Sequence, residues 1–194
     1  MALARVRGPG HPDHVCDMVA ATIAQEDLSR DATASLDIRV MGGRGALFVA
    51  GEVASRADFE VSSVVQRVTA AAGVTEDLSP FIAIEPMASP WAMGERTREA
   101  WNIIGYATKE TPEQLPSIMS RAQQIARVIE RERQTNSDWF WCGADYEVWV
   151  EHVKRTQVMI RIPHIETVTL IQIREQLTMV LRPLLQDMPL YVNM

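Results

Sequence analysis

The chain has 194 residues, a formal net charge of -6 and 47% hydrophobic residues. This length suits one large domain or two small ones, and the acidic balance argues against a general nucleic-acid or membrane-surface role. Cys16 and Cys142 are too few for a disulfide framework or a zinc site. No apolar run reaches membrane-spanning length and no signal peptide precedes the first motif, so we expect a cytoplasmic protein.

A helix is predicted to begin in the segment Gly8–His14 and to run to about Asp27. Pro12 suits the first helical turn, and the four-residue spacing of its apolar side chains (Val15, Val19, Ile23) marks the face that packs on a core. The helix N-terminus carries a partial positive charge, beside which the side chains of His11, Asp13 and His14 are expected to lie. The residues alone leave two interpretations open, a well-capped helix start and a ligand site.

The remainder of the first half has the pattern of two strands, a helix and a third strand. Leu36, Ile38 and Val40 alternate with polar residues, which predicts a half-buried strand, and the run that follows the glycine-rich turn is apolar throughout, as in a central strand. The expected elements are strands 35–41 and 46–54 joined by a turn at 42–45, a helix 59–72 capped by Asp58, and a strand 80–87.

The second half repeats this order after an irregular stretch, residues 88–102. The expected elements are a short strand 103–107, a helix 117–133 capped by Ser117, an aromatic strand 139–143 and 146–153, its partner 157–162, a helix from Thr167 or Thr169 to Arg182, and a strand 190–192. We therefore predict an α+β fold of two repeated helix–strand–strand–helix–strand units, each with its helices on one face of a largely antiparallel sheet. The predicted division is 1–110 and 111–194.

Three motifs occur in a fixed order along the chain: Gly10-His11-Pro12-Asp13, Leu47-Phe48-Val49-Ala50-Gly51-Glu52-Val53 and Gly105-Tyr106-Ala107-Thr108-Lys109-Glu110-Thr111. Together they resemble the S-adenosylmethionine synthetases, also called methionine adenosyltransferases. That family has three comparable α/β units around a pseudo-threefold axis, and this chain has the pattern of two. Because the family's subunits pack sheet against sheet with ligand between them, the resemblance implies a homodimer or higher homo-oligomer.

The resemblance also implies a chemistry, in which the sulfur of methionine attacks C5′ of ATP and displaces the triphosphate with the help of magnesium. His11 then matches the histidine beside the reacting centre, Asp13 a magnesium-binding aspartate, and Glu52 a glutamate on the methionine side. Asp37 falls near a glutamate that binds a monovalent cation, and His14 stands where the family has a lysine. The implied catalytic set is His11, Asp13, His14 and Glu52, with Mg²⁺ at Asp13 as the expected cofactor.

Further ligand-binding candidates are spread along the chain: Gly10, Asp37, Trp91 and Glu99 in the irregular stretch, and Tyr106. Glu99 lacks the glycine setting of the family's methionine-binding aspartate, and Asp145 stands near a family lysine. The family's lysine-bearing, glycine-rich phosphate segment has no counterpart. Removing one positioned charge from a transition state costs about 3–4 kcal/mol, so several losses predict that this chain alone does not make S-adenosylmethionine from ATP and methionine.

Two functions of different classes fit these residues. The first is a diverged, homodimeric enzyme for a small molecule, either an adenosyl- or methionine-like ligand or a substrate of acid–base chemistry with His11 as acid or base and Asp13 or Glu52 as its partner. The second is a non-catalytic subunit that assembles with a full-length synthetase and modulates it. Trp139, Trp141 and Trp149 fit core, interface or an apolar ligand wall. No nucleic-acid or membrane partner is expected.

Overall fold

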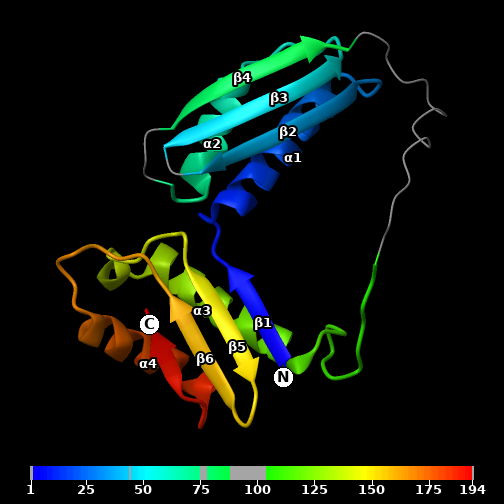
Figure 1. The fold of residues 1–194 in the computed structure, drawn as a ribbon. Helices are drawn as coiled ribbons and strands as arrows, with labels where there is room; N and C mark the ends of the chain where they lie inside the picture. Colours follow the sequence, from blue (N-terminus) through cyan, green and yellow to red (C-terminus); the bar gives the residue numbers. More distant parts are fainter. Residues whose placement is uncertain (1, 44, 75–77, 88–103, 194) are drawn as a thin grey trace. The chain divides into compact units, whose positions relative to one another are not determined.

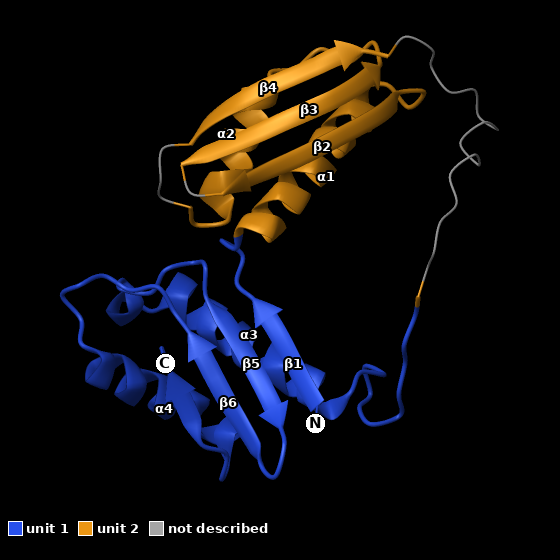
Figure 2. Cartoon of the chain, viewed as in Figure 1, with its two compact units in different colours: residues 1–11, 105–194 blue, residues 12–104 orange. Residues whose placement is uncertain are grey.

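The computed structural model describes residues 2–43, 45–74, 78–87 and 104–193. These residues form four α-helices and two mixed sheets, which confirms the predicted α+β class (Figure 1). They divide into two compact units, residues 1–11 with 105–194 (unit 1) and residues 12–104 (unit 2), coloured separately in Figure 2. No helix within the described ranges is long and apolar enough to cross a membrane.

Unit 2 is a three-stranded sheet with two helices on one face. Its elements are α1 (Pro12–Arg30), β2 (Ser35–Gly43), β3 (Ala46–Ala54), α2 (Val61–Ala71) and β4 (Ser79–Pro86). The strand order is β2-β3-β4, with β2 antiparallel and β4 parallel to β3. The apolar stripes of α1 and α2 pack on alternate residues of β3, and this core contains Val19, Ile23, Leu47, Val49 and Val65.

Unit 1 is a four-stranded sheet, also covered by helices on one face (Figure 1). Its elements are β1 (Ala2–Arg7), α3 (Ser117–Thr135), the short 3₁₀ helix η2 (Ser137–Trp139), β5 (Glu147–His152), β6 (Thr156–Arg161), α4 (Leu170–Leu185) and β7 (Leu190–Val192). The strand order is β1-β5-β6-β7, and only the β6–β7 pairing is parallel. Val148 and Val150 of β5 face a core shared with α3 and α4.

Strand β1 is an element that the sequence pattern did not reveal. It pairs antiparallel with β5 along its whole length, from Ala2 opposite His152 to Arg7 opposite Glu147. Residues 1–11, assigned from the sequence to the first unit, therefore complete the sheet of residues 105–194. Because β1 and β5 are about 140 residues apart in the sequence, no local pattern of residues indicates that they pair.

Several helix boundaries differ from the prediction for local reasons. Helix α1 includes residues 28–30, expected as a connection. Helix α2 is capped by Glu60, whose carboxylate accepts from the Ser62 backbone N–H at 3.4 Å, and not by Asp58. At α3 the residue expected as the cap, Ser117, is the first helical residue, and its N–H donates to Glu110 at 2.9 Å.

Differences in the second half follow from burial. Trp139 and Trp141 are 1% exposed and belong to η2 and the turn after it, so residues 139–143 do not form the expected strand. Helix α4 is capped by Thr169 in a capping box with Gln172, and it continues through Pro183 because Leu185 is buried in the core. Residues 104–107 form no strand.

Candidate functional site

The segment Gly8–His11 lies flat against residues 144–146 and extends the pairing of β1 with β5. The Gly8 N–H donates to the Tyr146 carbonyl at 2.7 Å, and the Gly10 N–H donates to the Ala144 carbonyl at 3.1 Å. A Cβ at Gly8 would lie 2.3 Å from the Ala144 carbonyl oxygen, and one at Gly10 would lie 2.7 Å from the Ala144 Cβ. The space beside both glycines, including the predicted ligand-binding residue Gly10, is therefore occupied by the protein itself.

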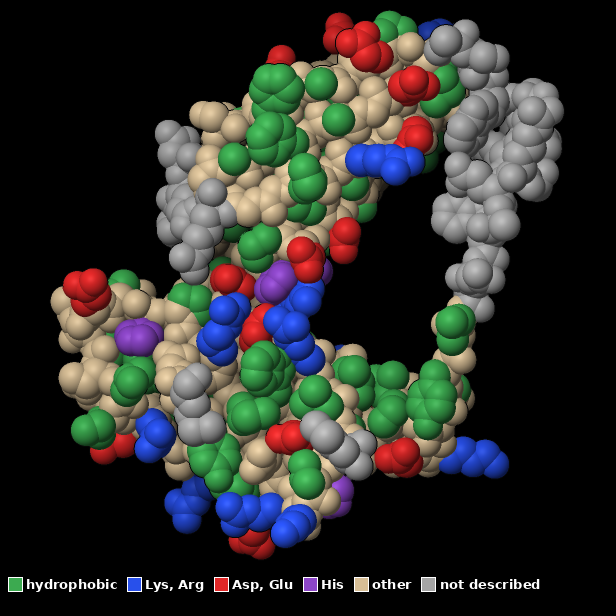
Figure 3. Space-filling model, viewed as in Figure 1, with side chains coloured by type: hydrophobic (Ala, Val, Ile, Leu, Met, Phe, Trp, Pro, Cys, Tyr) green, Lys and Arg blue, Asp and Glu red, His purple; other side chains and the backbone are tan. Residues whose placement is uncertain are grey.

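Because of this pairing, His11 lies beside a group of charged side chains at the end of the unit 1 sheet. The imidazole is 13% exposed, and its Nε2 lies 3.6 Å from Oε1 of Glu147, a carboxylate that is 2% exposed. Arg5 donates to the same oxygen, while Nε of Arg161 lies 3.4 Å from Oε2. Figure 3 shows side chains of both charges gathered in this region of unit 1. Glu147 was not among the residues selected from the sequence.

A sequence signal for Glu147 existed. Val148 and Val150 are apolar in a predicted strand, so strand alternation puts Glu147 on the opposite face. What the sequence did not show is that arginines of two neighbouring strands, Arg5 and Arg161, surround this position.

Asp13 and His14 lie in the first turn of α1, and both are exposed. A carboxylate in this turn interacts favourably with the helix dipole, and Asp13 makes at least one further interaction in the structure. These two residues belong to unit 2, whereas His11 belongs to unit 1. His11, Asp13 and His14 are close in sequence, but the structure divides them between the two units.

Two other predicted residues, Asp37 and Glu52, are brought together in unit 2. They are register partners on β2 and β3, and Glu85 of β4 is the next partner along the same row. Nε of Arg39 lies 3.4 Å from Oδ1 of Asp37. The predicted cation-side and methionine-side carboxylates therefore share one end of one sheet face.

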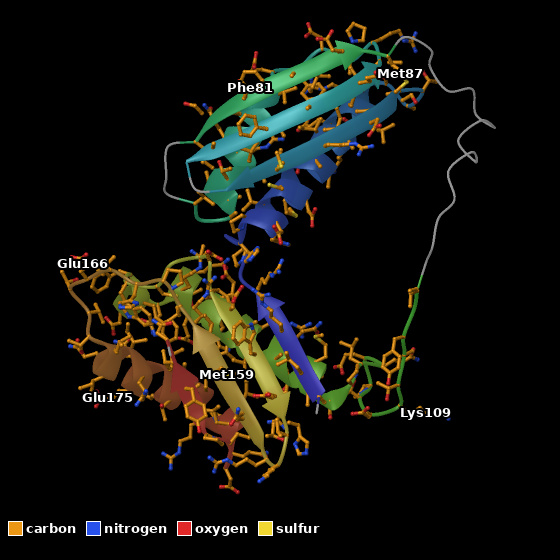
Figure 4. All side chains as sticks on the ribbon, in the orientation of Figure 1. Phe81, Met87, Lys109, Met159, Glu166 and Glu175 are labelled. Atoms are coloured by element: carbon orange, nitrogen blue, oxygen red, sulfur yellow. The ribbon has the colours of Figure 1, made fainter. Side chains whose placement is uncertain are left out.

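The face that carries these carboxylates is the one away from α1 and α2. By register and strand alternation its central part consists of nine residues, and we call them the unit 2 open face: Asp37, Arg39, Met41, Phe48, Ala50, Glu52, Phe81, Ala83 and Glu85. Met41 and Phe81 are 71% and 64% exposed, and the Phe48 and Phe81 rings are 5.8 Å apart. In Figure 3, hydrophobic side chains lie over one part of this unit and acidic ones towards the other end, and Figure 4 labels Phe81 on β4.

The remaining candidates are not assembled with these groups. Trp91 and Glu99 lie outside the described residues. Tyr106 is 77% exposed in a segment without regular structure. Trp139 and Trp141 pack on each other in the core with ring centroids 5.2 Å apart, whereas Trp149 lies under the guanidinium of Arg5.

The buried thiols and phenol are poor nucleophiles. Burial raises the pKa of Cys142 to about 12. Burial, and then the nearby charges of Asp13 and Asp17, raise the pKa of Cys16. Burial and the neighbouring carboxylate of Glu130 raise the pKa of Tyr146, whose hydroxyl donates to the Ala126 carbonyl at 3.1 Å. Among the candidate groups, the imidazoles and carboxylates are therefore better suited to acid–base chemistry than these thiols and this phenol.

Magnesium was expected at Asp13. Within the described ranges no group of three or more His, Cys, Asp or Glu side chains is arranged to hold a metal ion. Mg²⁺ usually takes one or two protein carboxylates and completes its shell with water and substrate phosphates. The described residues thus do not fit a metal site made by the protein alone.

The family model for the N-terminal domain of S-adenosylmethionine synthetase matches residues 4–89. Similar proteins include the S-adenosylmethionine synthases of Sorangium cellulosum (28% identical, 78% of this chain and 40% of that protein), Trichormus variabilis (26%, 65% and 36%) and Aquifex aeolicus (26%, 64% and 36%). The chain thus spans about 40% or less of the length of these relatives. With the order of motifs and the α+β units, these matches show that the chain is similar to the S-adenosylmethionine synthetases, and over residues 4–89 to their N-terminal domain.

Proposed function

We propose that the chain is a diverged synthetase-like enzyme that acts as a homodimer on a small molecule. The ligand is adenosyl- or methionine-like, or it is the substrate of acid–base chemistry that reuses the same groups. Ordinary synthesis of S-adenosylmethionine from ATP and methionine is not part of this proposal, because the positive charges needed for a triphosphate are replaced at His14 and Asp145.

The observation that carries the proposal is the unit 2 open face. It joins an apolar end, suited to burial against another sheet, to a row of carboxylates that contains the predicted ligand residues Glu52 and Asp37. Large side chains such as Met41 and Phe81 favour burial by about 1.5–3 kcal/mol each. A second copy docked here would bury them and bring its own charged groups to the carboxylates.

His11 supports the chemical part of the proposal. Its ring is mostly buried and lies beside a buried carboxylate, an arrangement used by general acids and bases. From the sequence, the candidate partner of His11 was Asp13 or Glu52. In unit 1, the described ion pair of the His11 imidazole is with the carboxylate of Glu147.

The dimer is tested with a matched pair of exposed apolar residues. Phe48→Glu puts a charge into the apolar end of the unit 2 open face, and Ile171→Glu puts one on an α4 side chain that is 72% exposed. We expect the Phe48→Glu protein to sediment as a monomer and the Ile171→Glu protein to sediment as a dimer. If both variants remain dimers, the proposed interface is wrong.

The enzyme is tested by ligand binding and turnover. S-adenosylmethionine, methionine and ATP are each titrated into the native protein by calorimetry, with and without Mg²⁺, and a metabolite extract is screened for compounds consumed. Glu52→Gln is expected to weaken binding of a ligand with an ammonium group by about tenfold or more, since a charged hydrogen bond is lost.

His11→Ala is expected to lower turnover by about a hundredfold or more. A folded His11→Ala protein with full turnover contradicts the proposal.

The alternative, a non-catalytic partner of a full-length synthetase, is supported by the same open face, which would accept the sheet of another family member. Mixing the native chain with a synthetase distinguishes the two functions. The alternative gains support if a mixed oligomer forms and Phe48→Glu abolishes this oligomer. The alternative is excluded if the chain remains a homodimer and does not bind the synthetase.

A further inference from the structure

Glu147 is a buried carboxylate on the face of the unit 1 sheet that α3 and α4 do not cover. It is the first residue of β5, and its register partners are Arg7 on β1 and Arg161 on β6. Its neighbours Val148 and Val150 point into the helix-covered core. Although Glu147 lies on the opposite face, it is only 2% exposed. Burying a carboxylate is costly unless charged partners surround it.

Two arginines fix the orientation of the Glu147 carboxylate. Arg5 of β1 donates to Oε1, and Nε of Arg161 of β6 lies 3.4 Å from Oε2. Arg161 also approaches Asp145 at 4.0 Å. Because one guanidinium holds each oxygen and the two come from strands on either side, the carboxylate has little freedom to rotate.

The backbone of His11 is fixed by a turn that follows the strand pairing. The Gly10 N–H donates to the Ala144 carbonyl, and the His11 N–H donates to the Gly8 carbonyl at 3.2 Å. Backbone hydrogen bonds do not set the orientation of the ring, which depends on contacts of the side chain. The Nε2 edge of the ring lies 3.6 Å from the immobilised Oε1 of Glu147.

We propose that Glu147 is the positioning residue of His11. The two arginines hold the carboxylate, and the carboxylate holds the Nε2 edge of the imidazole, so the ring has its working orientation before any ligand binds. Such preorganisation is what positioned catalytic groups require. This inference rests on the proposed function, in which His11 is the acid or base.

The test compares Glu147→Gln with Glu151→Gln. Glu151 is on the same strand and the same face, but its partner is Gln157 at 2.8 Å and not a histidine. Each protein is treated with diethyl pyrocarbonate, and the modification rate of each histidine is measured by peptide mass spectrometry. The exposed His14 serves as the internal reference.

We expect Glu147→Gln to raise the rate at His11 relative to His14 by about threefold or more, because the ring loses the attraction of the carboxylate that lies 3.6 Å from its Nε2. Glu151→Gln is expected to leave the ratio unchanged. An unchanged ratio in a folded Glu147→Gln protein overturns the proposal.

A measurement on the native protein covers the case in which Glu147→Gln does not fold. With ¹³C-labelled histidine, relaxation gives the order parameter of each ring. The His11 ring is expected to be nearly as rigid as backbone, with an order parameter of about 0.85, and the exposed His14 ring is expected to be clearly lower. Equal mobility of the two rings overturns the inference.

The two proposals fail in different ways. If the His11 ring is held but His11→Ala retains full turnover, the proposed function is wrong and the positioning contact stands. If turnover needs His11 but neither the modification ratio nor the order parameter responds as expected, the positioning role of Glu147 is wrong.

Discussion

At the scale of the residue, Asp31 is a carboxylate of unit 2 that hydrogen bonds hold in place. It is 6% exposed and accepts from the Thr33 hydroxyl at 2.6 Å, the Thr33 N–H at 3.0 Å and the Arg56 N–H at 2.9 Å. These hydrogen bonds, that of the Thr33 hydroxyl foremost, hold the pKa of Asp31 well below its ordinary value of 3.8. The side chain joins the end of α1 to the segment after β3.

This shift predicts a pH-dependent stability. Because the pKa of Asp31 is lower in the folded protein than in the unfolded chain, its contribution is complete above about pH 5 and declines as the pH falls through 3.8 towards the folded value. Asp31→Asn should lower the urea midpoint at pH 7, and the difference from the native protein should shrink by pH 3. Asp58→Asn, at an exposed carboxylate of the same unit, is the control. A difference that stays constant with pH would contradict the assignment.

At the scale of the element, Gly51 decides how β3 lies against β2. Its φ is +151°, and a Cβ at this position would lie 1.9 Å from the carbonyl oxygen of Asp37. The close approach of the two backbones occurs next to the register pair Asp37 and Glu52. The glycine of the second sequence motif is therefore explained by packing between strands.

Gly51→Ala should destabilise unit 2 by about 1–3 kcal/mol or more, because the new methyl group cannot fit without moving a strand. Gly43→Ala is the matched control, since nothing lies within 4 Å of a Cβ there and the change should stay within about 0.5 kcal/mol. Urea unfolding measures both. Similar midpoints for the two variants would show that β2 and β3 adapt to the added volume.

At the scale of the whole molecule, the two units interleave in sequence. Residues 12–104 form unit 2 between the N-terminal strand of unit 1 and the remainder of that unit. Strand β1 covers one edge of β5, buries Ala4 to 2% exposure and supplies Arg5 to Glu147. Unit 1 consequently depends on a segment at the far end of the chain.

Removal of residues 1–7 tests this dependence. Amides of β5, β6 and α3 should lose most of their hydrogen-exchange protection, whereas those of β2, β3 and α1 should keep it, because the edge of β5 and part of the unit 1 core become exposed. Leu3→Ser, at a β1 side chain that is 56% exposed, is the control and should change neither unit. Equal loss of protection in both units would refute their separate cohesion.

The local elements were largely readable from the sequence. Alternation of Leu36, Ile38 and Val40 predicted β2, and the apolar stripe of Val15, Val19 and Ile23 predicted α1, because one-sided burial leaves its period in the sequence. The boundaries of the helices were harder to predict. Glu60 caps α2, although Asp58 has the better side chain for that role. Helix α4 continues beyond Pro183 because Leu185 is buried.

The candidate site was readable only in part. The motifs located His11 and Glu52, and strand order brought Asp37 opposite Glu52. Glu147 was missed because its significance comes from Arg5 and Arg161, which belong to different strands of the sheet.

The sequence by itself determined the class of fold, the repeated order of elements and the similarity to S-adenosylmethionine synthetases, since each depends on local periodicity or on short contiguous motifs. Only the tertiary structure decided that β1 belongs to unit 1, that Gly8 and Gly10 adjoin protein backbone, and that a buried glutamate lies beside His11. The physical reason is that pairing between distant strands, and the burial of charge that follows from it, depend on contacts that leave no period in the chain.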